Sequence, residues 1–339
     1  MYGKHAQHTS MPSPRHSYQD TPNNTRLSNK QQPSQSTKTI KLIITLLFIL
    51  LINVLAIYTA IKRHNTKPIQ QYNLEQIEIE EPEPVDETLT LDSGLSIYAP
   101  IEFKDSYECK HLEDSISTLV DKGYAVGVYC YDIATGYKLA YNANESIYGA
   151  SAIKGPYCAY ICDTNKSLSE STKNLIYNCV VYSDNDAYES LRKIYGNKQF
   201  GEWRQDIPTT DPRNYPHWYI KMSASELGSL WKLIYKKEAE LPEGLLECYS
   251  KTQHSAIGNL FRPDFTVLSK PGWFPKDENN IPSTTDAGII YSDCGPYIMV
   301  VITDVSSDFT QITPIIDALN SAHGKMCGGS TKSFIQSTK

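Results

Sequence analysis

Three short motifs along the chain combine a nucleophile, two amines and a hydrogen-bonding amide. Ser151 opens the segment SAIK, which ends at Lys154. In a helix these two side chains share one face, so the Lys154 amine can accept the proton of the Ser151 hydroxyl. The motif SDN begins at Ser183 and KPG at Lys270, and they add a second hydroxyl and a second ammonium group. This set is typical of enzymes that form an acyl-serine intermediate.

The S-x-x-K pattern alone is weak evidence, because it also begins at Ser190 and at Ser229 within ordinary amphipathic helix patterns. Ser151 differs from these because small residues precede it and an apolar segment that would bury Lys154 follows it. Burial beside another cation lowers the pKa of an amine, so Lys154 would act as a base near neutral pH. The first turn of a helix also offers backbone N–H groups to a developing oxyanion.

The other two motifs have plain structural interpretations when each is taken alone. Ser, Asp and Asn all favour helix caps, so SDN at Ser183 is typical of a cap. KPG at Lys270 is typical of a strand that ends in a turn. Their occurrence in this order after a plausible nucleophile favours the catalytic interpretation.

The ordered motifs S-x-x-K, S-D-N and K-[TS]-G resemble those of class A β-lactamases and penicillin-binding proteins. Their surroundings are similar as well: YGASAIKGPY, VVYSDNDAYESL, LSKPGWF and TTDAGIIYSDCGPYIMVVIT. The resemblance spans about residues 110–323. It implies an α/β (α+β) fold in which a five-stranded antiparallel sheet is flanked by helices, with an inserted all-helical lobe and a cleft between lobe and sheet.

The resemblance also implies a role for each matching residue. Ser151 would be the acylated nucleophile and Lys154 its base. Ser183 would relay a proton to the departing nitrogen. Lys270 would attract the substrate carboxylate and help to lower the pKa of Lys154.

Four further positions follow from the same resemblance, which implies no cofactor. Asn185 and Gly272 would bind substrate. The backbone N–H groups of Ser151 and Trp273 would form the oxyanion hole, and removal of one such donor typically costs about 10²–10³ in rate. Asp184 would order its loop rather than contact substrate.

Two features depart from the family pattern. Pro271 replaces the usual Thr or Ser of the third motif, so a hydroxyl for the substrate carboxylate is missing. Proline donates no ladder hydrogen bond, which predicts an edge strand there. The short spacing of Ser151 and Ser183 predicts a trimmed helical lobe.

The most serious departure is the absence of the E-x-x-L-N motif between Gly196 and Ser223. In the family's β-lactamases its glutamate activates the water that frees the acyl-enzyme. Glu202 is expected on a helix before this loop, and Asp206 and Asp211 are weak substitutes. Because a general base is commonly worth about 10²–10⁴ in rate, we expect slow deacylation.

Hydropathy and composition divide the chain into five segments. They are a disordered polar tail (1–38), a transmembrane helix (39–62), an acidic stalk (63–95), the folded domain (96–325) and a C-terminal tail (326–339).

A buried core helix or a cleaved signal peptide is the alternative to the transmembrane helix. The apolar stretch is long and begins about forty residues into the chain, which favours an uncleaved single-pass anchor in the cell membrane. The excess of Lys and Arg before it predicts a cytoplasmic N-terminus and an extracellular domain. A net charge of −6 argues against nucleic acid as a partner.

Eight cysteines permit disulfides in an exported domain. They form no C-x-x-C pair and the histidines are scattered, so we expect no metal site. Some of them would be buried thiols. The resemblance to the family places Cys158 at a disulfide position, with Cys179 as its nearest partner, and a bridge from Cys162 to Cys179 is the alternative.

Hydrophobic periodicity predicts the elements of the domain. Strands are expected at 125–132, 137–141, 265–269, 287–291 and 297–303. Helices are expected at 112–122, 151–163, 174–182, 187–195, 223–235 and 313–323. This order fits an antiparallel sheet with terminal helices and a helical insertion.

Three functions fit these observations. The first is acyl-enzyme chemistry on a β-lactam amide. The second is a D,D-peptidase or penicillin-binding protein that acts on peptidoglycan stem peptides. The third is a silent wall-sensing module, which Pro271 and the missing glutamate favour, whereas the intact Ser151, Lys154, Ser183 and Lys270 speak against it.

Overall fold

The computed structural model describes residues 88–209, 219–277 and 281–328. The predicted polar tail and transmembrane helix lie outside them, as do residues 63–87 of the predicted stalk. The chain divides into Met1–Tyr72 and Asn73–Lys339, and every described residue belongs to the second unit. Within the described ranges, no helix is both long enough and apolar enough for a membrane span.

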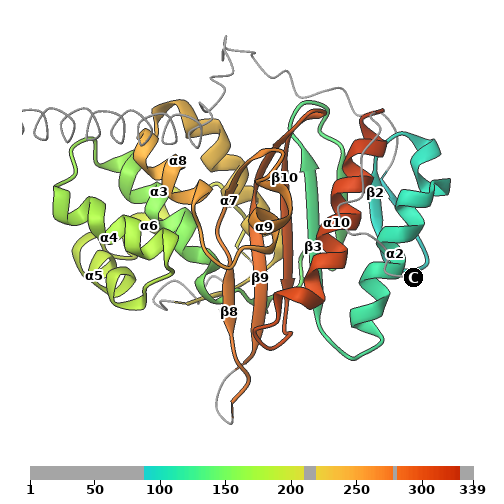
Figure 1. Cartoon of the computed structure of the whole chain (residues 1–339), viewed down its shortest axis with the longest axis horizontal. Helices are drawn as coiled ribbons and strands as arrows, with labels where there is room; N and C mark the ends of the chain where they lie inside the picture. The colour runs from blue at the N-terminus through green and yellow to red at the C-terminus, as the bar shows by residue number, and fades with distance from the viewer. Residues whose placement is uncertain (1–87, 210–218, 278–280, 329–339) are drawn as a thin grey trace, which may run out of the picture. The chain divides into compact units, whose positions relative to one another are not determined.

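One antiparallel sheet of eight strands forms the centre of the domain, in the order β1-β2-β4-β3-β10-β9-β7, with β8 also paired to β9 (Figure 1). The strands are β1 (Leu89–Thr90), β2 (Ser96–Tyr98), β3 (Val126–Asp132), β4 (Lys138–Tyr141), β7 (Thr266–Ser269), β8 (Gly272–Phe274), β9 (Ser283–Ser292) and β10 (Gly295–Thr303). A small second sheet pairs β5 (Ile147–Tyr148) with β6 (Lys221–Met222).

Helices cover both faces of the sheet (Figure 1). On one face lie α2 (Tyr107–Val120), α9 (Ala256–Phe261) and α10 (Phe309–Met326), with η1 (Ile101–Asp105) before α2. The other face carries α7 (Ala224–Lys237), η4 (Glu238–Glu240) and the helical lobe. The lobe comprises η2 (Ala150–Ile153), α3 (Lys154–Thr164), α4 (Glu170–Val181), α5 (Asn185–Tyr195), α6 (Lys198–Trp203) and α8 (Glu243–Ser250).

Strand β10 shows why the sheet is buried on both faces. Its side chains alternate, because successive residues of a strand point to opposite faces. Ile298 and Val300 pack into the core on the α7 side, whereas Met299 and Val301 pack into the core under α2 and α10. All four are fully buried. The apolar run that the sequence shows there is therefore a central strand.

The sheet has three more strands than the five that the family resemblance implies. Strands β1 and β2 extend it beyond β4, and β1 lies within the segment 63–95 predicted as stalk, so the folded domain begins before residue 96. The edge strand is divided into β7 and β8 at Pro271, which cannot donate a ladder hydrogen bond. The predicted edge position of this proline is confirmed.

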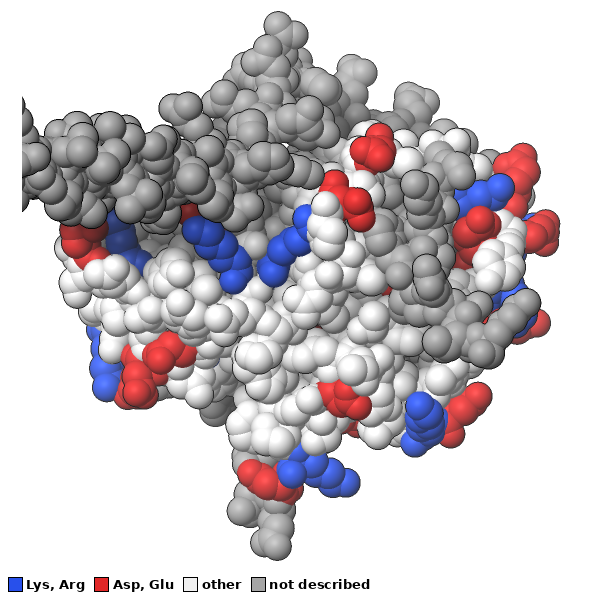
Figure 2. All heavy atoms as spheres, in the orientation of Figure 1, with Lys and Arg blue, Asp and Glu red and all other residues white. Residues whose placement is uncertain are grey.

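Charged side chains do not gather by sign on the face of the domain shown in Figure 2. Lys, Arg, Asp and Glu are scattered around its margin, and the centre of this face is largely uncharged. A continuous basic surface of the kind that binds nucleic acid is absent from this face.

The glycine of the third motif sets how closely the edge strand approaches the lobe. A Cβ atom added at Gly272 would lie 2.3 Å from the Gly149 oxygen, 2.5 Å from the Ala152 nitrogen and 2.8 Å from the Ser151 nitrogen. Real Cβ atoms essentially never come this close to backbone atoms. Strand β8 can therefore lie directly against the turn that carries Ser151 only because residue 272 is glycine.

We expect Gly272→Ala to push β8 away from this turn and to lower the free energy of unfolding by about 1–3 kcal/mol. Gly244→Ala is a matched control, because a Cβ at Gly244 in α8 meets nothing within 4 Å. That substitution should raise stability by about 0.5 kcal/mol, as is usual for Gly→Ala in a helix. Urea unfolding of both variants measures the difference, and equal stabilities would contradict the packing described here.

Candidate active site

Ser151 lies at the junction of the small sheet and the helical lobe. It belongs to the 3₁₀ turn η2, and Lys154 is the first residue of α3. Side chains three residues apart are eclipsed in a 3₁₀ helix, so the two residues share a face as predicted. Ser151 is buried with 9% of its surface exposed, and Lys154 is fully buried.

Lys154 connects its helix to the turn between α4 and α5. Its Nζ donates hydrogen bonds to the Ser183 backbone oxygen (2.6 Å) and to Oδ1 of Asn185 (2.7 Å). Burial away from water lowers the pKa of the Lys154 ammonium to about 8. Near neutral pH this amine can therefore exist in its unprotonated form and accept a proton.

Lys270 reaches the same turn from the end of β7. Its Nζ donates to Oγ of Ser183 (2.9 Å) and to the Pro271 backbone oxygen (2.8 Å), and its side chain is fully buried. Burial first, and then the nearby charge of Lys154, lower the pKa of Lys270 to about 7. Both amines are thus held on the two sides of Ser183.

The SDN turn both caps a helix and contacts the two lysines. Asp184 is the N-cap of α5, and its side chain accepts a hydrogen bond from the Ala187 N–H at 2.6 Å. Ser183 and Asn185 instead contact the two lysines. The cap interpretation is therefore confirmed for Asp184, while the catalytic role of Ser183 and the substrate-binding role of Asn185 stay predictions.

Backbone strain is concentrated in this region. Among the described residues, five non-glycine residues have positive φ, and Ala150 (45°), Ser183 (59°) and His254 (61°) are three of them. Ala150 directly precedes Ser151, and the His254 ring lies 5.2 Å from that of Trp273. Such conformations cost about 1–3 kcal/mol each and cluster at functional sites.

Gly272 and Trp273, the two predicted site residues on β8, belong to the strand that lies against the turn carrying Ser151. Gly272 packs against the backbone around Ser151. Trp273 pairs with Thr284 of β9, and its ring lies 5.8 Å from the Lys270 Nζ. The structure thus brings β8, Ser151 and Lys270 together, while the oxyanion role of the Trp273 N–H stays a prediction.

Tyr219 is a member of the site that the sequence analysis missed. Its hydroxyl donates to Oδ1 of Asn185 at 2.7 Å, the same oxygen that accepts from Lys154. Its ring centroid lies 5.6 Å from the Lys154 Nζ, as does that of Tyr188. Burial raises the pKa of Tyr219, so its hydroxyl remains protonated. Tyr219 stands in the segment where the family pattern would supply the missing glutamate.

None of the described carboxylates pairs with Lys154. Glu202 lies on α6, as expected, and its carboxylate is 3.6 Å from the Lys198 amine. Asp206 is exposed, and Asp211 lies outside the described residues. The only carboxylate among the charges that act on the pKa of Lys154 is Asp184, which already caps α5.

The predicted disulfides are not formed, because the structure gives all eight cysteines as free thiols. Cys158 and Cys179 nevertheless lie together beneath the site, with their sulfur atoms 3.7 Å apart. These are the two cysteines that the family resemblance predicts as partners, and they are neighbours without a bond between their sulfur atoms.

The other S-x-x-K sequences have structural roles. The Ser229 hydroxyl donates to the Ser225 backbone oxygen, and the Lys232 amine donates to the Tyr131 hydroxyl at 2.8 Å. Lys193 forms an ion pair with Glu189 on the same helix. Neither pattern combines a buried lysine with a second amine, which distinguishes them from Ser151 and Lys154.

Comparisons with known proteins bear on the family resemblance and on the fold. The model of the Beta-lactamase enzyme family matches residues 164–322, a range that includes Ser183 and Lys270 but not Ser151. No curated protein matches the chain.

Solved structures match over the fold. The β-lactamase from Sphaerobacter thermophilus is 16% identical with a TM-score of 0.52, and the match covers 65% of this chain and 97% of that one. A class A β-lactamase from Bacteroides cellulosilyticus gives the same identity and TM-score, with 65% and 99% covered. One from Clostridium kluyveri is 15% identical with a TM-score of 0.51, over 63% and 99%.

The resemblance inferred from the ordered motifs is therefore confirmed: a β-lactamase family model matches residues 164–322, and the domain shares the fold of solved β-lactamases. At 15–16% identity the solved structures bear on its fold alone.

The two lysines predict a bell-shaped pH dependence of acylation. The buried pair loses its protons with apparent pKa values of about 7 and about 8. Below this window both amines are charged and Lys154 cannot accept the Ser151 proton. Above it Lys270 no longer attracts a carboxylate. Because Lys270 has the lower pKa, the form with a neutral Lys154 and a charged Lys270 is the minor of the two singly protonated forms. Its population, and with it the second-order acylation rate, should still be highest between these two values.

Lys270→Arg supplies the matched variant for this pH profile. Arginine stays charged at all accessible pH values, so the alkaline limb should disappear while the acid limb remains. Stopped-flow labelling by a fluorescent penicillin from pH 5 to 10 measures both profiles. A rate independent of pH across this range would contradict the proton sharing described here.

Removal of the Tyr219 hydroxyl should shift the acid limb. In Tyr219→Phe, Oδ1 of Asn185 would accept a hydrogen bond from the Lys154 ammonium without competition from the tyrosine hydroxyl. This stronger hydrogen bond favours the charged amine and raises the pKa of Lys154. The acid limb should move to higher pH, and the rate at pH 7 should fall about 2–10-fold, roughly the effect of one hydrogen bond. Tyr160→Phe is the control, because that hydroxyl donates to the Tyr195 backbone oxygen. If both variants keep the wild-type pH dependence of the acylation rate, the Tyr219 hydroxyl has no influence on the pKa of Lys154.

Proposed function

We propose that the chain is a membrane-anchored, exported serine hydrolase that forms an acyl-enzyme on a β-lactam amide. The observation that carries this proposal is the pair of buried amines that both contact Ser183, one of which belongs to Lys154, three residues after Ser151. Burial of two amines is unfavourable for stability alone, because each charged form loses its hydration. A proton-transfer role explains why both are present.

Each residue of the site has a step in this mechanism. The Lys154 amine takes the proton of Ser151 as the serine oxygen attacks the amide carbon. The N–H groups of Ser151 and Trp273 stabilise the oxyanion. The proton then passes through the hydroxyl of Ser183 to the departing ring nitrogen, so that the amide C–N bond breaks and the acyl-serine ester remains.

Two charged or polar contacts would orient the substrate. The Lys270 ammonium would attract the substrate carboxylate. Because proline replaces the usual Thr or Ser at position 271, no hydroxyl adds to this contact, which is weaker than in the family pattern. Asn185 and Gly272 would hold the rest of the substrate along β8. The solved β-lactamases that share the fold support a β-lactam as the substrate class.

Release of the acyl group is the slow step in this proposal. Within the described parts of the chain Asp184, which caps α5, is the only carboxylate whose charge acts on the pKa of Lys154, and the ring of Tyr219 lies 5.6 Å from the same amine. A protonated tyrosine cannot activate water as a base. The acyl-enzyme should therefore persist, which is the behaviour of a penicillin-binding protein rather than of an efficient β-lactamase.

Residues 39–62 would anchor the chain in the cell membrane, with the tail 1–38 in the cytoplasm and the domain outside. The apolar length of this stretch and the basic residues before it support this arrangement. The lipid bilayer and a β-lactam or a peptidoglycan stem peptide would then be its partners.

The D,D-peptidase alternative uses the same residues on a peptide ending in D-configured amino acids, and slow acyl release is compatible with it. The silent wall-sensing module is less well supported. Lys154 and Lys270 remain buried and contact the SDN turn, whereas a pocket without chemistry would have no need for either amine.

Labelling of the full chain in membranes tests these proposals. A fluorescent penicillin should label the wild type stably and leave Ser151→Ala unlabelled, while a chromogenic cephalosporin turns over slowly. Ser229→Ala, the matched serine of another S-x-x-K, should label normally. Rapid colour without persistent label would indicate an efficient β-lactamase. Absence of both signals would contradict acyl-enzyme chemistry on β-lactams.

A further inference from the structure

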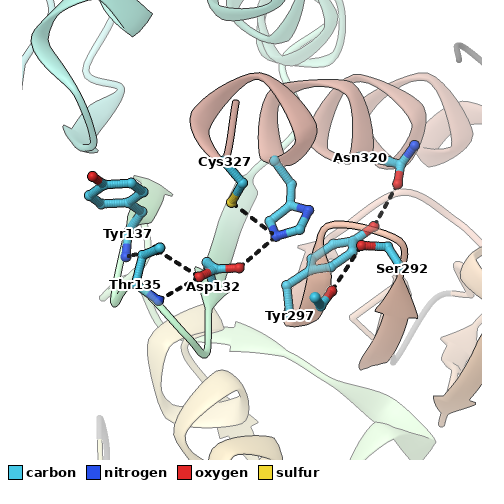
Figure 3. Close-up of polar contacts among 9 residues, drawn as sticks. Asp132, Thr135, Tyr137, Ser292, Tyr297, Asn320 and Cys327 are labelled. Atoms are coloured by element: carbon cyan, nitrogen blue, oxygen red, sulfur yellow. Dashed lines mark hydrogen bonds and ion pairs between the residues drawn. The ribbon is translucent and has the colours of Figure 1, made fainter. Parts of the chain in front are cut away.

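A second cluster of chemically active side chains lies on the other face of the sheet from Ser151. Asp132 ends β3, whereas His323 and Cys327 lie one turn apart at the C-terminal end of α10. Figure 3 shows Asp132 and Cys327 pointing toward each other from these two elements. The mechanism proposed for Ser151 uses none of these three residues.

The three side chains converge on one point. Nε2 of His323 lies 2.8 Å from Oδ2 of Asp132 and 3.6 Å from Sγ of Cys327. The three potential ligand atoms all lie within 4.8 Å of one another. Ligands of a tetrahedral zinc ion, at about 2.0–2.3 Å from the metal, lie roughly 3.3–3.8 Å apart. The separation of His323 and Cys327 already fits this geometry, whereas Asp132 and His323, now at hydrogen-bond distance, would move apart by about 0.5 Å to admit the ion.

The geometry does not suit a catalytic triad. In a Cys-His-Asp relay the carboxylate contacts one ring nitrogen and the thiol contacts the other, so that the ring passes a proton between them. Here the carboxylate and the thiol both approach Nε2 of His323. The carboxylate oxygen, the ring nitrogen and the sulfur can each donate an electron pair, so one cation placed between them could bind all three.

The surroundings hold two of the three groups in place. The other oxygen of Asp132 accepts from the Thr135 N–H (2.7 Å) and hydroxyl (2.6 Å), which leaves Oδ2 directed at His323. The His323 ring stacks on Tyr297 with centroids 3.9 Å apart. Asp132 and His323 are both buried, at 0% and 1% exposure. Partners of this kind fix ligand orientation in metal sites.

We propose that Asp132, His323 and Cys327 bind a divalent transition-metal ion of the zinc class. A thiolate, an imidazole and a carboxylate are a ligand set that favours zinc over calcium or magnesium, which prefer oxygen ligands alone. On binding, Cys327 loses its thiol proton, and the Nε2 proton leaves or moves to Nδ1, so the metal replaces protons at the same point. Cys327 is half-buried, which leaves a path for the ion and a fourth position for water.

A metal at this site would connect two parts of the chain that are far apart in the sequence. Asp132 and His323 are 191 residues apart, and β3 is paired on both sides within the sheet. A metal there would join the last helix to a central strand. No metal site is expected from the sequence, because it contains no C-x-x-C pair and its histidines are scattered. The three side chains proposed here combine a His-x-x-x-Cys spacing at the end of α10 with a distant aspartate.

Cobalt substitution of the full chain, solubilised in detergent, tests the site. After removal of metals by chelation, Co²⁺ should bind at one equivalent. It should give the visible bands of tetrahedral cobalt and a thiolate-to-cobalt charge-transfer band, and Zn²⁺ should displace it. Zn²⁺ should also raise the melting temperature of the metal-free protein.

Cys327→Ser should abolish the charge-transfer band and weaken Zn²⁺ binding at least about 100-fold, while its metal-free melting temperature stays that of the wild type. His323→Gln should weaken binding similarly. Cys248→Ser in α8 is the matched control and should bind as the wild type does. Absence of a thiolate band in the wild type, or its persistence in Cys327→Ser, would overturn the proposal.

Discussion

The burial of two ammonium groups around one serine is the constraint on which the rest of the site depends. Lys154 comes from the helical lobe and Lys270 from the edge of the sheet, and each contacts a different oxygen of Ser183. Removal of both amines from water lowers their pKa values to about 8 and about 7. The same desolvation that makes them useful near neutral pH also opposes folding. Close packing of lobe against sheet must offset that cost.

Several local features follow from this packing. Gly272 lets β8 come up against the turn that carries Ser151, where a side chain would collide with backbone. Positive φ at Ala150 and Ser183 directs these turns toward the lysines at some cost in stability. Tyr219 covers Lys154 and shares the oxygen of Asn185 with it, so the amine is shielded where the family pattern would place a water-activating glutamate. The proposed acyl transfer to the serine and the proposed slow release of the acyl group would both follow from this one arrangement.

The three motifs of the site could be predicted from the sequence. Tyr219, strand β1 and the contact between Asp132 and His323 could not, for physical reasons. The motifs at Ser151, Ser183 and Lys270 carry chemistry in their residue types, and the structure brings Lys154 and Lys270 to Ser183 as expected. Tyr219 shows no motif, because its role depends on how a loop returns to the site. Strand β1 is too short to show an apolar period, and it lies in a segment whose acidic residues and prolines predict a stalk. The Asp132 and His323 contact joins residues far apart in the chain, which no local pattern reveals.

Direct titration of the two buried lysines tests the central claim most closely. Lysine labelled with ¹³C at Cε allows each amine to be followed by NMR, with Lys154→Met and Lys270→Met used for assignment. A shared buried site should give two resonances that titrate near pH 7 and pH 8. In either variant one resonance should be lost, and the remaining lysine should titrate at a changed pH. If every lysine of the folded protein instead titrated above pH 10, neither amine could be a base near neutrality, and the proposed acyl-enzyme chemistry would lose its physical basis.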